Sequence, residues 1–384
     1  MTDEPRTATV PAMVNAHSHA FQRGLRGRGE RPAPAAHAAD DFWSWRETMY
    51  RLASDLDPES MRSAAARTYG EMAAAGYGAV GEFHYVHHRA DGRPYDDPNA
   101  LAIAVAEAGV AAGLTVVLLP AAYHRAGWDG APLPPAPGQR RFCDPRVGDF
   151  LARVDALRKW AAGRPRVRVG VAAHSVRAVP ADWLTAIAEY AELHGLVRHV
   201  HAAEQRRELT ECEAEHGCSP VELLERSGFL GERTSLVHGI HVSPRDIELL
   251  AESRTIVVSC PTTEGNLGDG HLPALRYRDA GVRLAIGSDS QVRLDPFEET
   301  RELETGARRE GQTRHGLLAA AGDLWRRLVR HGEASLGLDE GEAGSVTVNL
   351  DHSDLAGVAK EDLELALATC ASAGVVLTSP AHGR

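Results

Sequence analysis

Short apolar runs alternate with longer amphipathic stretches along most of the chain, which is the pattern of successive βαβ units. Strands are expected at 8–19, 79–85, 115–121, 167–174, 196–201, 235–238, 255–260 and 282–289, and helices at 58–75, 98–113, 147–162, 181–194, 206–227, 244–252, 271–280 and beyond Pro296. Eight strands, each followed by a helix, predict an α/β protein built on a (β/α)8 TIM-type barrel. An open doubly wound sheet is the alternative architecture, but no Gly-x-Gly-x-x-Gly follows the first strand.

Two stretches lie outside this alternation. Residues 20–58 are rich in Arg, Gly, Pro and Ala, lack a clear period, and contain Trp43-Ser44-Trp45-Arg46. Because long irregular segments in compact domains are commonly functional, we expect a lid over a site here. Helical pattern resumes at 316–328, and a weaker strand is expected at 346–350. The predicted division is a barrel with C-terminal helices over 8–340 and a remnant of a small β domain over 341–384.

Composition narrows the function classes. The chain has 384 residues, a formal net charge of -11 and five scattered cysteines. The negative charge argues against a nucleic-acid-binding surface and against an anionic membrane as partner. No apolar span of about twenty residues and no signal-peptide pattern is found, so neither a membrane helix nor export is expected. An odd number of scattered cysteines is typical of reduced thiols, which favours a cytoplasmic location.

Side chains capable of chemistry gather where predicted strands end. Alternation along a strand places His17 and His19 on the same face. Further candidates close the fourth, fifth, sixth and eighth strands, namely His174, His201, His238 and Asp289. A single histidine in such a place is more commonly structural, but the carboxyl ends of barrel strands form one active-site face. The group as a whole therefore predicts a site there.

The donor types favour one divalent metal ion, with Zn2+ as the expected species. His17, His19, His201 and Asp289 would supply three imidazoles and a carboxylate, a set that suits zinc. An ion held this way lowers the pKa of water from about 15.7 towards about 7. The only lysines are Lys159, in a predicted helix, and Lys360, near the end of the chain. Neither is placed to bridge two metals as a carbamate, which favours a mononuclear site.

Two further residues are candidates for handling protons beside this ion. Glu204 follows His201 by three residues and could act as a proton shuttle. It could equally serve as a carboxylate in the first turn of the next helix, where the helix dipole favours it. His238 could polarise the substrate or help to take a proton from water, and Asp289 could assist it. Glu204, His238 and Asp289 are thus the predicted catalytic residues.

With these residues in place, the sequence resembles the amidohydrolase superfamily and, within it, the formimidoylglutamate deiminase family, from about residue 11 to about residue 340. The shared segments are His-Ser-His-Ala-Phe-Gln (17–22), Phe-Trp-Ser-Trp-Arg (42–46), Glu-Phe-His-Tyr-Val-His-His (82–88), His-Ser-Val-Arg (174–177), His-Ala-Ala-Glu-Gln (201–205), Leu-Val-His (236–238), Ser-Cys-Pro-Thr-Thr-Glu continuing to Gly270 (259–270) and Gly-Ser-Asp-Ser (287–290). The His-x-His and Ser-Asp elements are general to the superfamily. The segments at 42–46, 82–88 and 174–177 are more particular to these deiminases.

The resemblance implies a substrate and a set of contacts. The activity would be hydrolysis of N-formimino-L-glutamate, in histidine degradation, to N-formyl-L-glutamate and ammonia. The residues implied to hold the substrate are Gln22, Arg46, Tyr85, His174 and Arg177. This fits the chemistry independently, because the substrate is a dicarboxylate amidine and arginine forks bind carboxylates bidentately.

Two alternatives stay open. A mononuclear deaminase of a purine-like or aminated heterocycle would favour stacking and amide contacts over paired arginines. A non-catalytic barrel relic would bind metal without turnover, although Glu204 and the metal-ligand set are all present. Metal content together with ammonia release would separate these readings.

The small β domain is expected to be reduced. Members of the resembled family carry an N-terminal segment that joins C-terminal strands in a β-sandwich beside the barrel. Here the first strand begins about eight residues into the sequence, so we expect that half to be missing. Because an isolated hairpin is marginally stable and leaves edges uncovered, a partner subunit in a homodimer is one way of completing the sheet.

Overall fold

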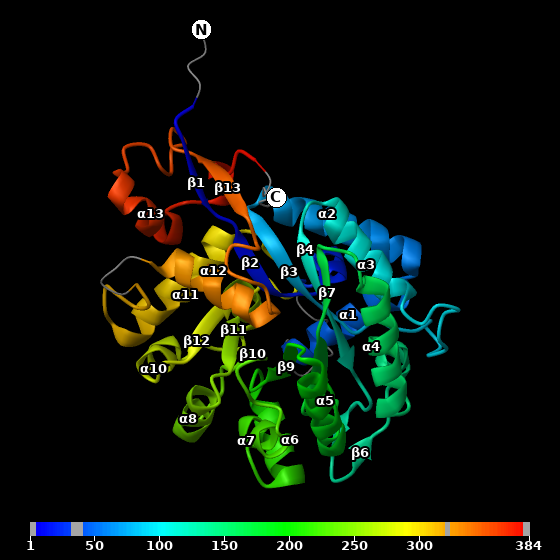
Figure 1. The fold of residues 1–384 in the computed structure, drawn as a ribbon. Coiled ribbons are helices and arrows are strands. Elements are labelled where there is room, and N and C mark those ends of the chain that lie inside the picture. Colours follow the sequence, from blue (N-terminus) through cyan, green and yellow to red (C-terminus); the bar gives the residue numbers. More distant parts are fainter. Residues whose placement is uncertain (1–4, 32–40, 319–322, 379–384) are drawn as a thin grey trace.

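Eight strand positions form a parallel barrel in the computed structural model, which describes residues 5–31, 41–318 and 323–378 (Figure 1). In spatial order they are β12 (Arg283–Ile286), β11 (Ile256–Ser259), β10 (Thr234–His238), β9 (Arg198–Ala202), β8 (Val171–Ser175), β4 (Thr115–Ala122), β3 (Tyr77–His84) and β2 (Met13–Ser18). Their side chains are almost all buried on both faces, as parallel strands covered by helices require. The predicted (β/α)8 barrel is confirmed.

The barrel closes between its first and last strands just beyond the end of β12. Ser18 and Asp289 form a parallel bridge, and the backbone N–H groups of Ser288 and Asp289 both donate to the carbonyl of His17 at 3.0 Å. Gly287 permits this approach, because a Cβ atom there would lie 2.8 Å from both the Cβ and the carbonyl oxygen of His17. Closure therefore sets Asp289 directly beside the first strand.

Helices surround the barrel and cap one end of it (Figure 1). Those in the outer ring are α2 (Pro58–Ala74), α3 (Ala100–Ala111), α4 (Val147–Ala161), α5 (Ala181–His194), α6 (Arg206–His216), α7 (Pro220–Arg226), α8 (Pro244–Glu252), α10 (Ala274–Asp279) and α11 (Pro296–Gly311). Several start with a side-chain cap followed by proline, as at Asp57-Pro58 and Ser243-Pro244. The helix α12 (Leu324–Leu336) contacts the early residues of β9 and β10 through Ser335. It therefore covers the end of the barrel opposite the carboxyl ends of the strands.

The first apolar run is two strands rather than one. β1 (Thr7–Pro11) pairs antiparallel with β13 (Ser345–Asn349), and the chain then enters the barrel as β2. At the junction, the Ala12 N–H donates to Gly344 of the small sheet and the Met13 N–H donates to Gly76 of the barrel. The predicted C-terminal strand is thus confirmed, with β1 as its partner. The domain boundary at 340 and completion by a partner subunit stay predictions.

The prediction of an irregular segment over 20–58 was wrong in its second half. α1 (Phe42–Ser54) is a regular helix, preceded by a short 3-10 helix at Ala20–Leu25, while 32–40 lie outside the described residues. Asp41 caps α1 by accepting from the N–H groups of Trp43 and Ser44 at 2.9 and 3.3 Å. Asp41 is visible in the sequence as a possible helix cap. The tryptophans and arginines that follow it, however, do not show the regular spacing of apolar residues that predicts a helix.

Smaller differences have local causes. The predicted helix at 206–227 is interrupted by Gly217, with φ of +64°, and resumes after Pro220. The predicted strand at 167–174 is divided into β7 (Val167–Val169) and β8 at Gly170, where a Cβ would lie 2.7 Å from the Val197 carbonyl oxygen. α9 (Pro261–Leu267) was not predicted. The helix expected at 316–328 is α12, beginning at Leu324, and 319–322 lie outside the described residues.

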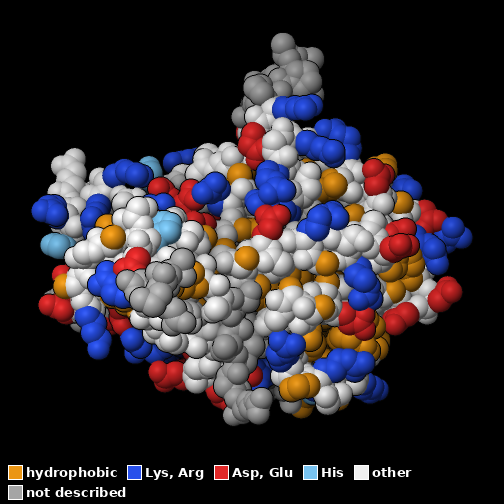
Figure 2. Space-filling model, turned by 90° about the horizontal axis from the view of Figure 1, so that it is seen from above, with side chains coloured by type: hydrophobic (Ala, Val, Ile, Leu, Met, Phe, Trp, Pro, Cys, Tyr) orange, Lys and Arg blue, Asp and Glu red, His pale blue; other side chains and the backbone are white. Residues whose placement is uncertain are grey.

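Acidic and basic side chains are interspersed across the face shown in Figure 2. Among the described residues, no helix is both long and apolar enough to cross a membrane. In the C-terminal part, α13 (Leu363–Thr369) packs against α11 and α12. Val376, directly after a 3-10 turn at Ala373–Val375, forms an antiparallel bridge with Val348 of β13.

Candidate active site

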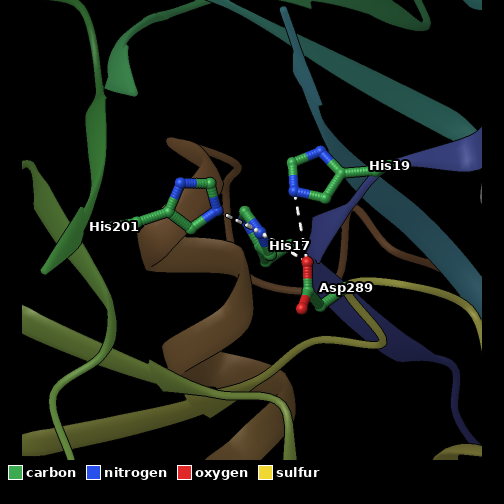
Figure 3. A group of neighbouring side chains, drawn as sticks. All are labelled: His17, His19, His201 and Asp289. Carbon is green, nitrogen blue, oxygen red and sulfur yellow. Dashed lines mark hydrogen bonds and ion pairs between the residues drawn. The ribbon is translucent and has the colours of Figure 1, made fainter. Parts of the chain in front are cut away.

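Four of the predicted residues converge at the carboxyl ends of the strands (Figure 3). One ligand atom from each of His17, His19, His201 and Asp289 lies within 4.8 Å of all the others. His17 Nε2 is 3.0 Å from His201 Nε2, and Asp289 Oδ1 is 3.3 Å from His17 Nε2 and 3.2 Å from His19 Nε2. All four side chains are buried. The structure therefore brings together the complete predicted ligand set from β2, β9 and the segment after β12.

Backbone carbonyls fix which nitrogen faces the centre of this group. His19 Nδ1 donates to the Phe83 carbonyl at 2.8 Å, and His201 Nδ1 donates to the His174 carbonyl at 2.7 Å. With a proton on Nδ1, His19 turns its Nε2 towards Asp289 and His201 turns its Nε2 towards His17 Nε2. This is the arrangement in which protein scaffolds orient metal-binding histidines. The donor set and its geometry fit a divalent cation.

Burial and close contacts favour the neutral form of His17 and His201 and the ionised form of Asp289. Burial lowers the pKa of His17 to about 3 and holds that of His201 well below its ordinary value. Burial alone would raise the pKa of Asp289, but its close contacts with the His17 and His19 rings hold it well below the usual range. Three imidazole nitrogens and one carboxylate oxygen are a donor set that suits a dication.

Glu204 and His238 lie beside this group. Glu204 follows β9, after Ala203 with φ of +55°, and His238 ends β10 with φ of +74°. Their closest approach is 3.9 Å, between Glu204 Oε1 and His238 Nε2. Burial raises the pKa of Glu204. Burial would lower the pKa of His238, but the charges of Glu204 and neighbouring carboxylates raise it to about 10.

A pocket above the four-residue group contains every predicted substrate contact. Its lining includes Gln22, Arg46, Tyr85, His174 and Arg177 together with His19, His201, Glu204, His238 and Asp289. Gln22 Nε2 donates to the Tyr85 hydroxyl at 2.7 Å, which ties the 3-10 helix after β2 to the end of β3. The helix α1 supplies Arg46 and aromatic side chains to the pocket wall. The segment predicted to form a lid thus contributes a helix to the pocket wall, and its role as a lid stays a prediction.

The pocket holds polar atoms that have no partner within the protein. Arg46 Nε and Nη1, Arg177 Nε and Gln22 Oε1 are buried without a hydrogen bond among the described residues. Unsatisfied buried donors are unfavourable, and donors on guanidinium groups carry a full charge. Paired guanidinium donors in a pocket match an anionic ligand, and carboxylates match their fork geometry.

Four buried residues near the site were not predicted. Glu208 lines the pocket and accepts from the N–H groups of Ala203 and Glu204 at 3.2 and 3.3 Å. Burial raises its pKa to about 7. Tyr50 and Tyr123 also line the pocket. Glu264 contacts His238, and its position in the Ser-Cys-Pro-Thr-Thr-Glu segment was the one signal that could have identified it.

The geometry and the comparisons agree on the class of protein. The chain belongs to the amidohydrolase family, whose model matches residues 8–322. It is a hydrolase of carbon–nitrogen bonds in a superfamily of metal-dependent enzymes.

Three similar proteins are of particular interest. The chain is similar to formimidoylglutamate deiminase of Pseudomonas aeruginosa, with 42% identity over 313 residues, covering 81% of this chain and 67% of the relative. It is 29% identical to a 5-methylthioadenosine/S-adenosylhomocysteine deaminase of Haloarcula marismortui, covering 86% of this chain and 69% of that protein. Among solved structures, an amidohydrolase from Brucella melitensis has a TM-score of 0.86 and 33% identity, covering 98% of this chain and 86% of that one.

Proposed function

We propose that this protein hydrolyses N-formimino-L-glutamate to N-formyl-L-glutamate and ammonia, a step of histidine degradation. The observation that carries the proposal is that Arg46 and Arg177, in the pocket above the His/Asp group, have buried guanidinium donors with no partner among the described residues. A substrate with two carboxylates would satisfy both. The 42% identity to a formimidoylglutamate deiminase supports the same substrate.

The proposed cofactor is one Zn2+ ion held by His17, His19, His201 and Asp289. Three imidazole nitrogens and a carboxylate oxygen are donors that zinc favours, and Nδ1 hydrogen bonds already orient two of the rings. When bound, such an ion would polarise the reacting groups and make water a nucleophile near neutral pH. Lys159 lies in α4 and Lys360 in a 3-10 turn, so neither lysine could bridge a second ion.

The remaining residues would bind the substrate and move protons. Arg46 and Arg177 would hold the two carboxylates, with Gln22, Tyr85 and His174 completing the wall, so that the formimino carbon faces Glu204 and His238. Water adds to that carbon and one carbon–nitrogen bond breaks. The raised pKa of His238 would fall beside a bound dication, and the neutral ring, assisted by Asp289, would accept the proton of the attacking water. Glu204 would deliver a proton to the departing nitrogen. The products balance as a formyl amide and ammonia.

The competing proposal is deamination of a heterocycle, as in the relatives that act on 5-methylthioadenosine. A neutral purine in the pocket would leave the buried donors of Arg46 and Arg177 without an anionic partner, which disfavours this proposal. The deciding experiment measures ammonia release by the purified, metal-loaded chain from N-formimino-L-glutamate, N-formiminoglycine, adenosine and guanine. We expect turnover of the dicarboxylate, much weaker turnover of the glycine analogue and none of the purines. Faster turnover of a purine would overturn the proposal, and metal binding without any turnover would support the relic reading.

A further inference from the structure

Glu264 is a buried carboxylate on α9 that contacts the active site without lining the pocket. Its Oε1 accepts from His238 Nδ1 at 3.2 Å and from the Cys260 N–H at 2.7 Å, while its Oε2 accepts from the Ser259 hydroxyl at 2.8 Å. The side chains of Glu264 and His238 are 4% and 2% exposed. We propose that Glu264 is the positioning residue of His238, an inference that rests on the proposed function.

The hydrogen bond decides which nitrogen of His238 is available to the substrate. A carboxylate can only accept, so Nδ1 must carry the proton that it shares with Glu264. In the neutral ring this leaves Nε2 as the acceptor, and Nε2 is the nitrogen that faces Glu204 Oε1, 3.9 Å away. Without Glu264, the other tautomer would place a proton on the nitrogen that must receive one.

The backbone conformation of His238 is a second reason why its ring requires a fixed hydrogen-bond partner. Its φ of +74° is in the left-handed region, where a side chain other than glycine is strained. The next residue, Gly239, is held by a 2.6 Å hydrogen bond from the Tyr277 hydroxyl to its carbonyl. Tyr277 thus holds the backbone next to His238, and Glu264 of α9 holds the His238 ring. Together the two contacts fix the direction in which Nε2 points.

His238, Cys260 and Glu264 could also be considered as ligands of a second metal, because their donor atoms lie within 4.8 Å of one another. The hydrogen bonds argue against that reading. Both oxygens of Glu264 already accept from N–H or O–H donors, and a cation there would displace them. Burial also raises the pKa of the Cys260 thiol well above its ordinary value, which keeps it protonated.

The test is a double-mutant cycle between Glu264 and His238, measured as kcat and KM of steady-state ammonia release from N-formimino-L-glutamate. Variants are Glu264→Ala, Glu264→Gln, His238→Asn and the double variant Glu264→Ala/His238→Asn. Glu299→Ala is the matched control, because Glu299 is equally buried and caps the same helix through Thr262 N–H and Oγ1, at 3.0 and 2.5 Å. Thermal unfolding and metal content are measured on each variant.

We expect Glu264→Ala to lower kcat about 100-fold with KM changed less than about threefold, because the group it orients acts in proton transfer. Glu264→Gln keeps an acceptor oxygen and should stay within about tenfold of the parent kcat. In the His238→Asn background, Glu264→Ala should change kcat less than about threefold, since the partner that it acts through is already gone. Glu299→Ala should lower the unfolding temperature comparably while retaining kcat.

An equal loss from Glu264→Ala in both backgrounds would overturn the inference, as would a loss of kcat in Glu299→Ala equal to that in Glu264→Ala. Either result would mean that the carboxylate only maintains the fold around α9. Failure of the proposed function is a separate result, because it requires that the parent protein itself release no ammonia from N-formimino-L-glutamate. If the parent protein is active but the effects of the two substitutions on kcat simply add, the proposed function stands and only the inference about Glu264 fails.

Discussion

The guanidinium carbon of Arg177 lies 5.3 Å from the centre of the Trp43 ring, although the two residues belong to distant parts of the chain. The same ring lies 4.6 Å from the guanidinium carbon of Arg46 and 4.5 Å from that of Arg207. Trp43 therefore joins α1, the segment after β8 and α6 over the pocket. The contact explains how two like charges are held close together in a pocket wall, since each is attracted to the π face.

Replacing Trp43 by leucine should weaken substrate binding more than it slows the chemical step. Each cation–π contact is worth about 0.5–2 kcal/mol, so loss of two contacts to the pocket arginines should raise KM about tenfold. Steady-state kinetics with N-formimino-L-glutamate provide the measurement. Trp160→Leu is the control, because Trp160 makes a similar 4.4 Å contact with Arg164 outside the pocket. An unchanged KM in Trp43→Leu would show that the stack does not position the arginines.

Arg177→Met should reduce activity on the dicarboxylate selectively. Loss of a charge-assisted hydrogen-bond donor is worth about 2 kcal/mol, so kcat/KM should fall about 30-fold on N-formimino-L-glutamate. Any residual turnover of a substrate with one carboxylate fewer should fall less. Arg164→Met removes an arginine away from the site and should have no effect on either substrate. An equal loss of Arg177→Met activity on every substrate would indicate a structural role.

His201→Ala should remove the bound metal, whereas His199→Ala should retain it. Both histidines lie on β9, but His199 donates from its ring Nε2 to the Ser335 carbonyl of α12, away from the other three ligand candidates. Metal content per chain, measured after dialysis against a weak chelator, should approach zero only in His201→Ala. Metal binding should also raise the unfolding temperature of the parent protein, because a ligand of the folded state stabilises that state. Full retention of metal by His201→Ala would exclude it from the ligand set.

Acid sensitivity should depend on a second buried cluster, away from the metal group. Arg153 donates to both oxygens of Asp144, at 3.1 and 2.6 Å. Burial raises the pKa of Asp144, but hydrogen bonds from His88 and Arg153 outweigh it and hold that pKa well below the usual value. A depressed pKa in the folded state stabilises the protein above the unfolded pKa of about 3.9, and this stabilisation is lost as the pH falls through the folded value.

Asp144→Asn should therefore lower the free energy of unfolding at pH 7 by about 3 kcal/mol, because it leaves Arg153 buried without its counter-charge. The difference from the parent protein should shrink progressively as the pH is lowered below about 3.9. Urea unfolding between pH 7 and pH 3 supplies the curves. Asp149→Asn, which breaks an exposed pair with Arg146, is the control. Its free energy of unfolding should stay close to that of the parent protein at each pH. A pH-independent difference would contradict the assignment of the charge effect to Asp144.

The barrel and the four-residue group could be predicted from sequence because both depend on local patterns. Apolar runs of the length of a strand mark the barrel, and parallel topology places their last residues on one rim. His17, His201 and Asp289 could thus be assigned to one place without knowing any contact between them. Arg46 and Arg177 could be assigned to the pocket wall only from the resemblance to the deiminase family, because no periodic pattern in the sequence indicates them.

Other features depend on contacts between distant segments and could not be predicted. The helical form of α1 rests on a cap by Asp41 and on packing of its buried face, neither of which dominates the local composition. The division between β1 and β2 depends on backbone hydrogen bonds from Ala12 and Met13 to two different sheets. The role of Glu264 emerges only when α9 is placed beside β10.

One metal ion and two arginines in this barrel are proposed to act together on a dicarboxylate amidine. The most direct measurement is ammonia release from N-formimino-L-glutamate as Zn2+ is titrated into metal-free protein. We expect the rate to rise linearly and to reach its plateau at one equivalent per chain. A plateau only at two equivalents, or no ammonia release at any loading, would contradict the account.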